Sequence, residues 1–334
     1  MSRISFLRMH QELVRVLRKF DFSADRADTC ARLFSEASLD GVYSHGLNRF
    51  PRFVEYIRKG YINVDAIPEK IAAIGVIEQW DGNLGPGNLN AQFCMDRALS
   101  IAKTNGMGLV ALRNTNHWMR GGAYGWQAAE AGFIGICFTN TQPNMPPWGA
   151  KNAVLGNNPL IIALPAPDHP IVLDTAMTQF SFGKIEAYRR EGKLLPVPGG
   201  FDTRGELTVD PGEIEKSWRA LPFGFWKGSG LSLVLDLVAS VLSGGMCTVQ
   251  VGEQGSDEYG LSQVFLAIDP HSVGDPVHYQ EVIKKTLMAV HDAEPAREGE
   301  QVYYPGERTI QTRKYNIENG IPVDDRFWEE ICAM

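Results

Sequence analysis

The chain has 334 residues, of which 44% are hydrophobic, so it is long enough to fold into two or three packed layers. Its formal net charge of −7 argues against a nucleic-acid partner, because phosphate binding needs a clustered basic surface. The longest apolar stretch, residues 231–242, is too short to cross a bilayer and contains Asp236, so we expect no membrane partner. Five scattered cysteines without paired spacing predict neither a disulfide framework nor a metal site, and they favour a reducing, cytoplasmic location.

The N-terminal part of the chain has the periodicity of helices. Apolar side chains recur at nearly helical spacing over 4–20. A second helix is expected to begin after the N-cap residue Ser23 and to end near Gly41, and a third covers 50–59. We therefore predict a helical N-terminal region, 1–68, which contributes the polar turn between its last two helices to a candidate active site.

The remainder of the chain, 69–334, alternates short β-rich runs with helices. Strands are expected at 74–80, 108–112, 133–139, 159–164, 170–174 and 264–268, and helices at 89–104, 123–131, 229–243 and 279–291. This mixture predicts an α/β region. The Pro/Gly-rich segment 196–212 is expected to form a long lid or interface loop.

A possible dinucleotide fingerprint occurs at Gly106-Met107-Gly108, which with Ala111 fits the pattern G-x-G-x-x-A. A Rossmann fingerprint must follow a strand and open a helix, so that the pyrophosphate lies at the helix N-terminus. Here a helix precedes the glycines and a strand follows them. We interpret the motif as a tight turn, so any nicotinamide cofactor must bind to a different scaffold.

The turn between the second and third helices holds the first candidate for catalysis. His45 lies beside Gly46, which would allow a ligand to approach closely, and Arg49 follows four residues later. An arginine could clamp the carboxylate of a 2-keto acid, while the histidine donates a proton to the carbonyl oxygen. The alternative is a histidine that only caps a helix end, and spacing alone does not decide between the two.

Two further polar groups follow predicted strands. His117 lies in the segment 113–125, between a strand and a helix, where α/β proteins place ligands. It could contact substrate or relay a proton, or it could be a buried histidine that holds the loop. Asn140, after the strand at 133–139, could orient a substrate hydroxyl or simply close a turn.

Three later segments have the features of backbone that faces a ligand. The first, 170–176, is a strand that runs into a turn of small residues, and the third, 305–308, is a turn beside an arginine. The second, 223–230, precedes an apolar helix, so its free N–H groups could receive a phosphate, with Lys227 supplying charge.

Four motifs together resemble the malate/L-lactate dehydrogenase type 2 family. They are Tyr-Ser-His-Gly-x-Asn-Arg-Phe at 43–50, Leu-Arg-Asn-x-Asn-His-Trp-Met-Arg-Gly-Gly at 112–122, Met-Pro-Pro-Trp-Gly-Ala-Lys at 145–151 and Phe-Trp-Lys-Gly-Ser-Gly at 225–230. The likeness extends from the first helix to the last.

The resemblance implies a non-Rossmann α/β fold that binds a nicotinamide cofactor, and a homodimer with its active site near the subunit interface. It also implies NADH-linked reduction of 2,3-diketo-L-gulonate to 3-keto-L-gulonate, with His45 as the proton donor. The choice between NADH and NADPH depends on one charge near the adenosine ribose, which the sequence does not identify. The resemblance places the cofactor against Pro170, Ile171, Val172, Leu173, Asp174, Thr175, Ala176, Trp226, Lys227, Gly306, Glu307 and Arg308. Contacts of Arg49, His117 and Asn140 with substrate are our own inference from the residues.

Two other functions remain open at this point. The chain could be a dehydrogenase for malate, lactate, ureidoglycolate or a related 2-hydroxy acid of the same family. It could also be a non-catalytic protein that binds a sugar acid or a nucleotide, although intact His45, Arg49 and Lys227 argue against this.

Overall fold

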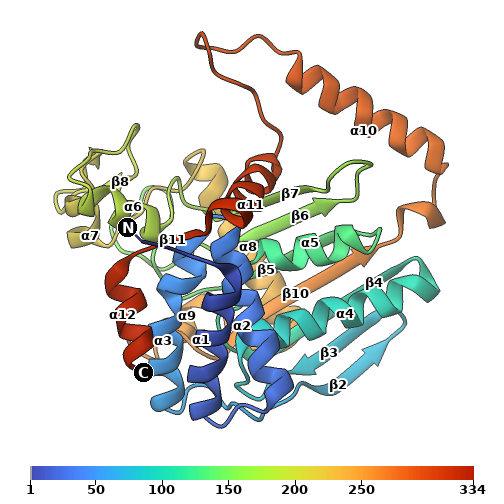
Figure 1. The fold of residues 1–334 in the computed structure, drawn as a ribbon, viewed down its shortest axis with the longest axis horizontal. Coiled ribbons are helices and arrows are strands. Elements are labelled where there is room, and N and C mark those ends of the chain that lie inside the picture. The colour runs from blue at the N-terminus through green and yellow to red at the C-terminus, as the bar shows by residue number, and fades with distance from the viewer. Residues whose placement is uncertain (1) are drawn as a thin grey trace.

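A mixed seven-stranded sheet forms the centre of the computed structural model, which describes residues 2–334 (Figure 1). The strand order is β2-β3-β4-β10-β5-β6-β7, and only β3 and β4 run parallel. A doubly wound nucleotide-binding sheet is mostly parallel, so this topology confirms the predicted non-Rossmann α/β fold. The strands are β2 Glu69–Ile74, β3 Ile77–Asp81, β4 Met107–Thr115, β5 Ile134–Thr139, β6 Leu160–Leu164, β7 Ile171–Thr175 and β10 Leu261–Ile268.

Helices cover both faces of this sheet. Helices α4 (Gly87–Asn105) and α5 (Gly122–Glu130) pack on one face, and α8 (Trp226–Ser243) packs on the other. On the central strand β10, Phe265 is buried with the first pair of helices, whereas its neighbour Val264 is buried with α8. Successive side chains of a strand point to opposite faces, so β10 must be apolar on both.

The turn at Gly106 is confirmed as the link between α4 and β4. Gly106 caps the C-terminus of α4 in the left-handed conformation, with φ of +81°, and the strand begins at Met107. A left-handed residue at this position ends the helix and favours glycine. The glycines therefore do not open a phosphate-binding helix.

The N-terminal region forms a separate layer of helices, α1 (Phe6–Lys19), α2 (Ala24–Leu39) and α3 (Phe50–Arg58). The Ser23 hydroxyl caps α2, as expected. Strand β1 (Ser2–Ile4) pairs with β11 (Ile321–Val323), and α12 (Asp325–Ala333) packs against α1 and α3 (Figure 1). The boundary near residue 68 stays a prediction. The structure shows in addition that C-terminal residues belong to the same core as the N-terminal helices.

The segment 180–218 forms what we call the peripheral lobe, at the edge of the molecule in Figure 1. It contains α6 (Phe182–Arg190), α7 (Pro211–Ser217) and a small hairpin of β8 (Gly200–Phe201) with β9 (Leu207–Thr208). Ile185, Leu195 and Ile214 form its own small core. The segment 196–212 is mostly loop, as expected, but it also contains this two-residue hairpin and the start of α7, which were not expected.

The remaining elements are α9 (Thr248–Gly252), α10 (Pro276–His291), α11 (Glu307–Asn319) and three 3-10 turns, Tyr43–His45, Leu47–Arg49 and Pro270–Ser272. Helix α10 extends away from the body of the molecule (Figure 1). The strand predicted at 74–80 is observed as β3 but begins only at Ile77, since Gly75, with φ of +55°, forms the turn of the β2–β3 hairpin. No helix within residues 2–334 is long and apolar enough to cross a membrane.

Candidate active site

The turn that carries His45 is held by a close backbone approach to helix α2. A Cβ on Gly46 would lie 2.2 Å from Ser38 Oγ, so only glycine fits at this position. The same Ser38 hydroxyl accepts a hydrogen bond of 2.8 Å from the backbone N–H of Leu47. Buried Leu47 then anchors the turn in the N-terminal core. This packing leaves His45 and Arg49 half-buried at the surface of the layer.

His45 and His117, predicted separately, lie together in the structure. Their rings stack with centroids 5.7 Å apart. The backbone N–H of Met119 donates to His117 Nδ1 at 2.9 Å, which places the proton of the neutral His117 ring on Nε2. Nε2 lies 4.0 Å from Glu258 Oε1. Ser44 Oγ is hydrogen-bonded to His45 Nδ1 at 3.0 Å, which leaves Nε2 of His45 as the nitrogen available to a ligand.

Both histidines are neutral at pH 7. Desolvation, with the positive charges of Arg49 and Arg120, lowers the pKa of His45 to about 4. Desolvation also lowers the pKa of His117 well below its usual value, and Arg49 and His45 add to this effect. Burial removes water from the charged imidazolium, and nearby cations oppose its charge.

Arg49 has a guanidinium without a hydrogen-bond or ion-pair partner among the described residues. Desolvation and the adjacent Arg52 lower its pKa, whereas Glu258 acts in the opposite direction. Glu258 is buried, and its Oε2 accepts a hydrogen bond from the Gln142 backbone while its Oε1 has no partner. A half-buried guanidinium without an anion is suited to receive the carboxylate of a ligand.

Asn140 differs from the other three candidates, because protein groups occupy its amide. The side chain is completely buried, and its Nδ2 donates to Asp236 Oδ1 at 2.9 Å and to the Met246 carbonyl at 2.7 Å. Its Oδ1 accepts from the Ser262 backbone at 2.8 Å. No donor remains for a substrate hydroxyl, so these bonds favour the structural alternative.

Sequence reasoning missed a buried ionic cluster behind the histidines. Asp40, at the end of α2, pairs with Arg120 through Oδ2 and with Arg313 of α11 through Oδ1 at 2.8 Å. Arg120 is 6% exposed, and its Nε has no partner. Arg120 also influences Asp174. Desolvation raises the pKa of this carboxyl, and Arg120 and the hydrogen bond from the Gly122 backbone oppose part of that rise. Arg120 therefore lies between the histidine pair and the predicted cofactor segment.

Two of the three predicted cofactor segments lie directly beside each other. The backbone N–H of Val172 in the edge strand β7 donates to the Pro305 carbonyl at 3.0 Å. A Cβ on Gly306 would lie 3.1 Å from that same nitrogen, so glycine at 306 permits the close approach. Asp174 accepts a 2.8 Å bond from the N–H of Gly122 at the start of α5.

The remaining segment, 223–230, lies at the other end of β7. Phe223 donates to the carbonyl of Met177, which joins the start of α8 to the residues that follow the strand. Trp226 is 65% exposed, Lys227 is exposed and has no ion-pair partner among the described residues, and Phe225 has φ of +60°. Non-glycine residues in strained conformations cluster at functional sites.

The start of α8 has fewer free N–H groups than expected. The amides of Lys227, Gly228 and Ser229 donate to the carbonyls of Gly224, Phe223 and Phe225. At the start of α11, by contrast, the amides of Arg308 and Thr309 donate to no other described residue. A helix N-terminus with free amides favours an anion, so α11 is the better phosphate site.

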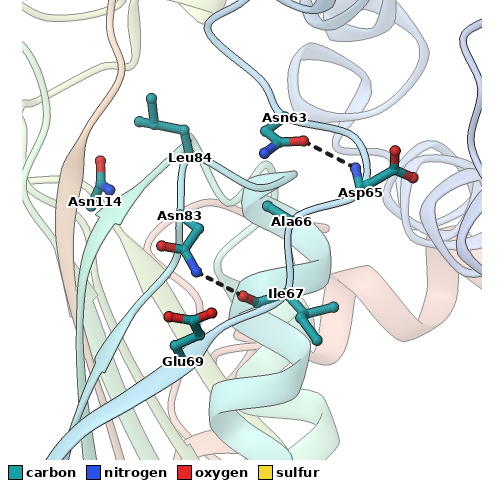
Figure 2. Close-up of a pocket in the computed structure, with 8 residues that line it drawn as sticks. All are labelled: Asn63, Asp65, Ala66, Ile67, Glu69, Asn83, Leu84 and Asn114. Carbon is teal, nitrogen blue, oxygen red and sulfur yellow. Dashed lines mark hydrogen bonds between the residues drawn. The ribbon is translucent and has the colours of Figure 1, made fainter.

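Two hollows of the surface bear on the candidate site, and one of them adjoins it. The hollow in Figure 2, about 520 Å³, is lined by amides and carboxylates such as Asn63, Asp65 and Glu69, and none of the predicted site residues borders it. Its acidic lining would repel an anionic keto acid. The other cleft, about 550 Å³, includes Arg52 and Gln142 and therefore lies next to Arg49 and Glu258. Within residues 2–334, no group of three or more His, Cys, Asp or Glu side chains could hold a metal ion.

The chain belongs to the malate/L-lactate dehydrogenase family, whose model matches residues 4–332. It is an oxidoreductase that acts on CH–OH groups with a nicotinamide cofactor. The features described fit such a cofactor: the close approach at Gly306, the free amides of α11, and the exposed Trp226 and Lys227.

The relatives carry a more specific name. The chain is 47% identical over 333 residues to the 2,3-diketo-L-gulonate reductase of Citrobacter koseri, which covers 99% of this chain and 100% of that protein. It is 46% identical over 332 residues to the reductase of the same name from Salmonella heidelberg, covering 99% of this chain and 100% of the relative.

Solved structures show the same fold at lower identity. Malate dehydrogenase from Entamoeba histolytica superposes with a TM-score of 0.93 at 26% identity, covering 99% of this chain and 96% of that one. Sulfolactate dehydrogenase from Methanocaldococcus jannaschii gives a TM-score of 0.90 at 29% identity, covering 99% and 97%.

Proposed function

We propose that this protein reduces the 2-keto group of 2,3-diketo-L-gulonate to give 3-keto-L-gulonate, with NADH as the reductant. The observation that carries the proposal is the grouping of neutral His45, neutral His117 and the unpaired guanidinium of Arg49 in one half-buried site. The names of the relatives at 46–47% identity support the substrate. A region of 1–68 and a region of 69–334 would each contribute to the site.

Each residue has a role that follows from its contacts. Arg49 binds the substrate carboxylate through two parallel hydrogen bonds. Ser44 holds His45 through Nδ1, so that Nε2 faces the carbonyl oxygen. A bound carboxylate favours the protonated His45 ring, which gives its Nε2 proton to that oxygen and is left neutral. His117, fixed by Met119 and facing Glu258, donates from Nε2 within the same site. The bound nicotinamide supplies the hydride to the substrate C2.

We assign cofactor binding to the segments around β7, the start of α8 and the start of α11. The free amides of Arg308 and Thr309 would receive a phosphate. The Glu307 carboxylate lies at the same helix start, and the Arg308 guanidinium rests over the Tyr303 ring, 4.6 Å from its centroid. A carboxylate near the adenosine ribose disfavours a 2′-phosphate, so we propose NADH over NADPH.

The test is loss of reduced-nicotinamide absorbance with purified protein. NADH and NADPH are each tested against 2,3-diketo-L-gulonate, pyruvate and oxaloacetate. A large preference in kcat/KM for diketogulonate supports the assignment. Better turnover of another acid would keep the mechanism and replace the substrate. The second candidate function is a dehydrogenase for another 2-hydroxy acid, because malate and sulfolactate dehydrogenases are among the structural neighbours.

We also propose a homodimer, because one face of α8 is apolar and uncovered in the single chain. Side chains at helical spacing on this face are 38–76% exposed, namely Leu233, Val234, Leu237, Val238 and Val241. Exposed apolar patches of this kind mark interfaces. The same helix begins with Trp226 and Lys227, so a partner on this face would lie close to the cofactor. Five unpaired thiols are consistent with a reducing, cytoplasmic location.

A further inference from the structure

A cleft of about 550 Å³ borders the candidate site on the side of Arg52 and Gln142. Two links connect it to the histidines. The Gln142 backbone donates to Glu258 at 3.2 Å, and Glu258 lies 4.0 Å from His117 Nε2. Arg52, in the first turn of α3, lies one helical turn after the N-cap residue Arg49, and its positive charge lowers the pKa of Arg49. A ligand held by Arg49 could therefore extend into the cleft.

The cleft presents hydrogen-bonding groups that the protein does not use. Arg52 donates from Nη2 to the Tyr56 hydroxyl at 2.9 Å, which leaves most of its five donors free. The Gln142 side-chain amide and the Glu253 carboxylate have no partner among the described residues, and both line the cleft. Arg52 thus offers hydrogen-bond donors, Glu253 offers acceptors, and the amide of Gln142 offers both.

Apolar side chains also line the cleft, and the peripheral lobe contributes Trp218 to them. Trp218 is 44% exposed, and its ring is stacked on Phe182 at 4.2 Å between centroids. Its backbone has φ of +54°, a conformation that few non-glycine residues adopt. The rest of the apolar lining is Pro143, Ala153, Val154 and Val249.

We propose that this cleft is the subsite for the hydroxylated tail of a six-carbon 2-keto acid, whose carboxylate Arg49 holds. The inference rests on the proposed function and deepens it. Hydroxyl groups both donate and accept, so they match the unused groups of Arg52, Gln142 and Glu253. The C–H face of the tail would pack on Trp218. A three-carbon acid such as pyruvate has no such tail.

The test compares Gln142→Ala and Glu253→Gln with wild type. Each variant should lower kcat/KM for 2,3-diketo-L-gulonate by roughly threefold to tenfold, as expected for one lost hydrogen bond. The kcat/KM for pyruvate should stay within about twofold of wild type, because pyruvate does not form the hydrogen bond that each substitution removes. Glu69→Gln, the same substitution in the hollow of Figure 2, is the matched control and should change neither.

A second measurement does not depend on turnover. Calorimetry with NADH present gives the affinity for L-gulonate, which has the tail but no reducible keto group, and for L-lactate. If both variants bind L-gulonate more weakly but bind L-lactate as the wild type does, the result supports the subsite, even if the wild-type enzyme reduces some other acid. Equal losses for long and short acids, or unchanged binding of L-gulonate, would overturn it.

Discussion

The imidazole rings of His45 and His117 stack with their centroids 5.7 Å apart and their planes within 26° of parallel. The two residues come from different layers, one from the turn after α2 and the other from the loop after β4. A proton on one ring opposes a proton on the other, and the arginines nearby oppose both. In the free site both rings are therefore neutral, and a bound anionic substrate favours the protonated ring.

The pH dependence of the oxidation reaction should reflect this depressed pKa. Neutral His45 is the base in that direction, so kcat/KM should be level at neutral pH and fall only as the pH approaches about 4. Burial and Arg49 both lower this pKa, so Arg49→Met should move the acidic limb to higher pH, towards 6.5. The measurement is the pH profile, supported by NMR titration of His45.

Arg58→Met provides the control for that profile. Arg58 lies on the same helix, but its guanidinium rests over the Phe20 ring. An acidic limb that stays in place in Arg49→Met would show that Arg49 does not set the charge of His45.

Replacement of His45 by alanine should reduce turnover by about 10²–10⁴-fold, as expected on loss of a general acid. Binding of NADH, followed by fluorescence, should be nearly unchanged, because the proposed cofactor segments lie along β7, α8 and α11. His10→Ala, at a histidine of α1 bonded to the Asp28 backbone, serves as the control. Full activity in the His45 variant would remove the residue from this role.

Gly183→Ala should lower activity without unfolding the protein. A Cβ on Gly183 would lie 2.8 Å from Ser44 Cβ, so the peripheral lobe or the catalytic turn must shift. Since Ser44 orients His45, we expect kcat/KM to fall by about tenfold to 10²-fold, while the unfolding midpoint changes little. Gly274→Ala, whose Cβ would first meet the Pro270 oxygen at 3.7 Å, should be neutral. Wild-type kcat/KM in Gly183→Ala would refute the contact.

Asp40→Asn should cost stability. Asp40 is 7% exposed and neutralises Arg120 and Arg313, so its loss leaves a buried guanidinium without a counter-charge. Removing one partner of a buried pair costs about 3–5 kcal/mol, which denaturant unfolding can measure. Arg204→Gln, which breaks a pair at an 81% exposed side chain, should change the free energy of unfolding by about 1 kcal/mol or less. Similar effects of both changes would contradict the buried cluster.

The sequence predicted those elements whose signals are local. The Ser23 cap, the period of α1 and the short β-rich runs within β4 and β10 each depend on neighbouring residues, and the structure confirms them. Helices α6, α11 and α12 were missed. Exposed and polar residues weaken the apolar period of α6 and α11, and α12 has only nine residues over which a period could be recognised.

The candidate site was only partly predictable for the same reason. The turn with His45 and Arg49 and the loop with His117 were identified from residue types and family motifs. Asp40, Arg313 and Gly183 were not, since their partners Arg120, Asp40 and Ser44 lie far away in the chain. Arg120 stood within a quoted motif, yet nothing in its neighbours indicates that it pairs with Asp40.

The pairing of Ile4 with Ile321 has a consequence for how the protein is made. The core beneath the catalytic turn includes Ile321, Trp328 and Ile331, which are synthesised long after the N-terminal helices. N-terminal segments usually fold as they are synthesised, but this layer cannot complete its core until these later residues have left the ribosome. The segment that contains His45 is thus synthesised well before the core beneath it can form.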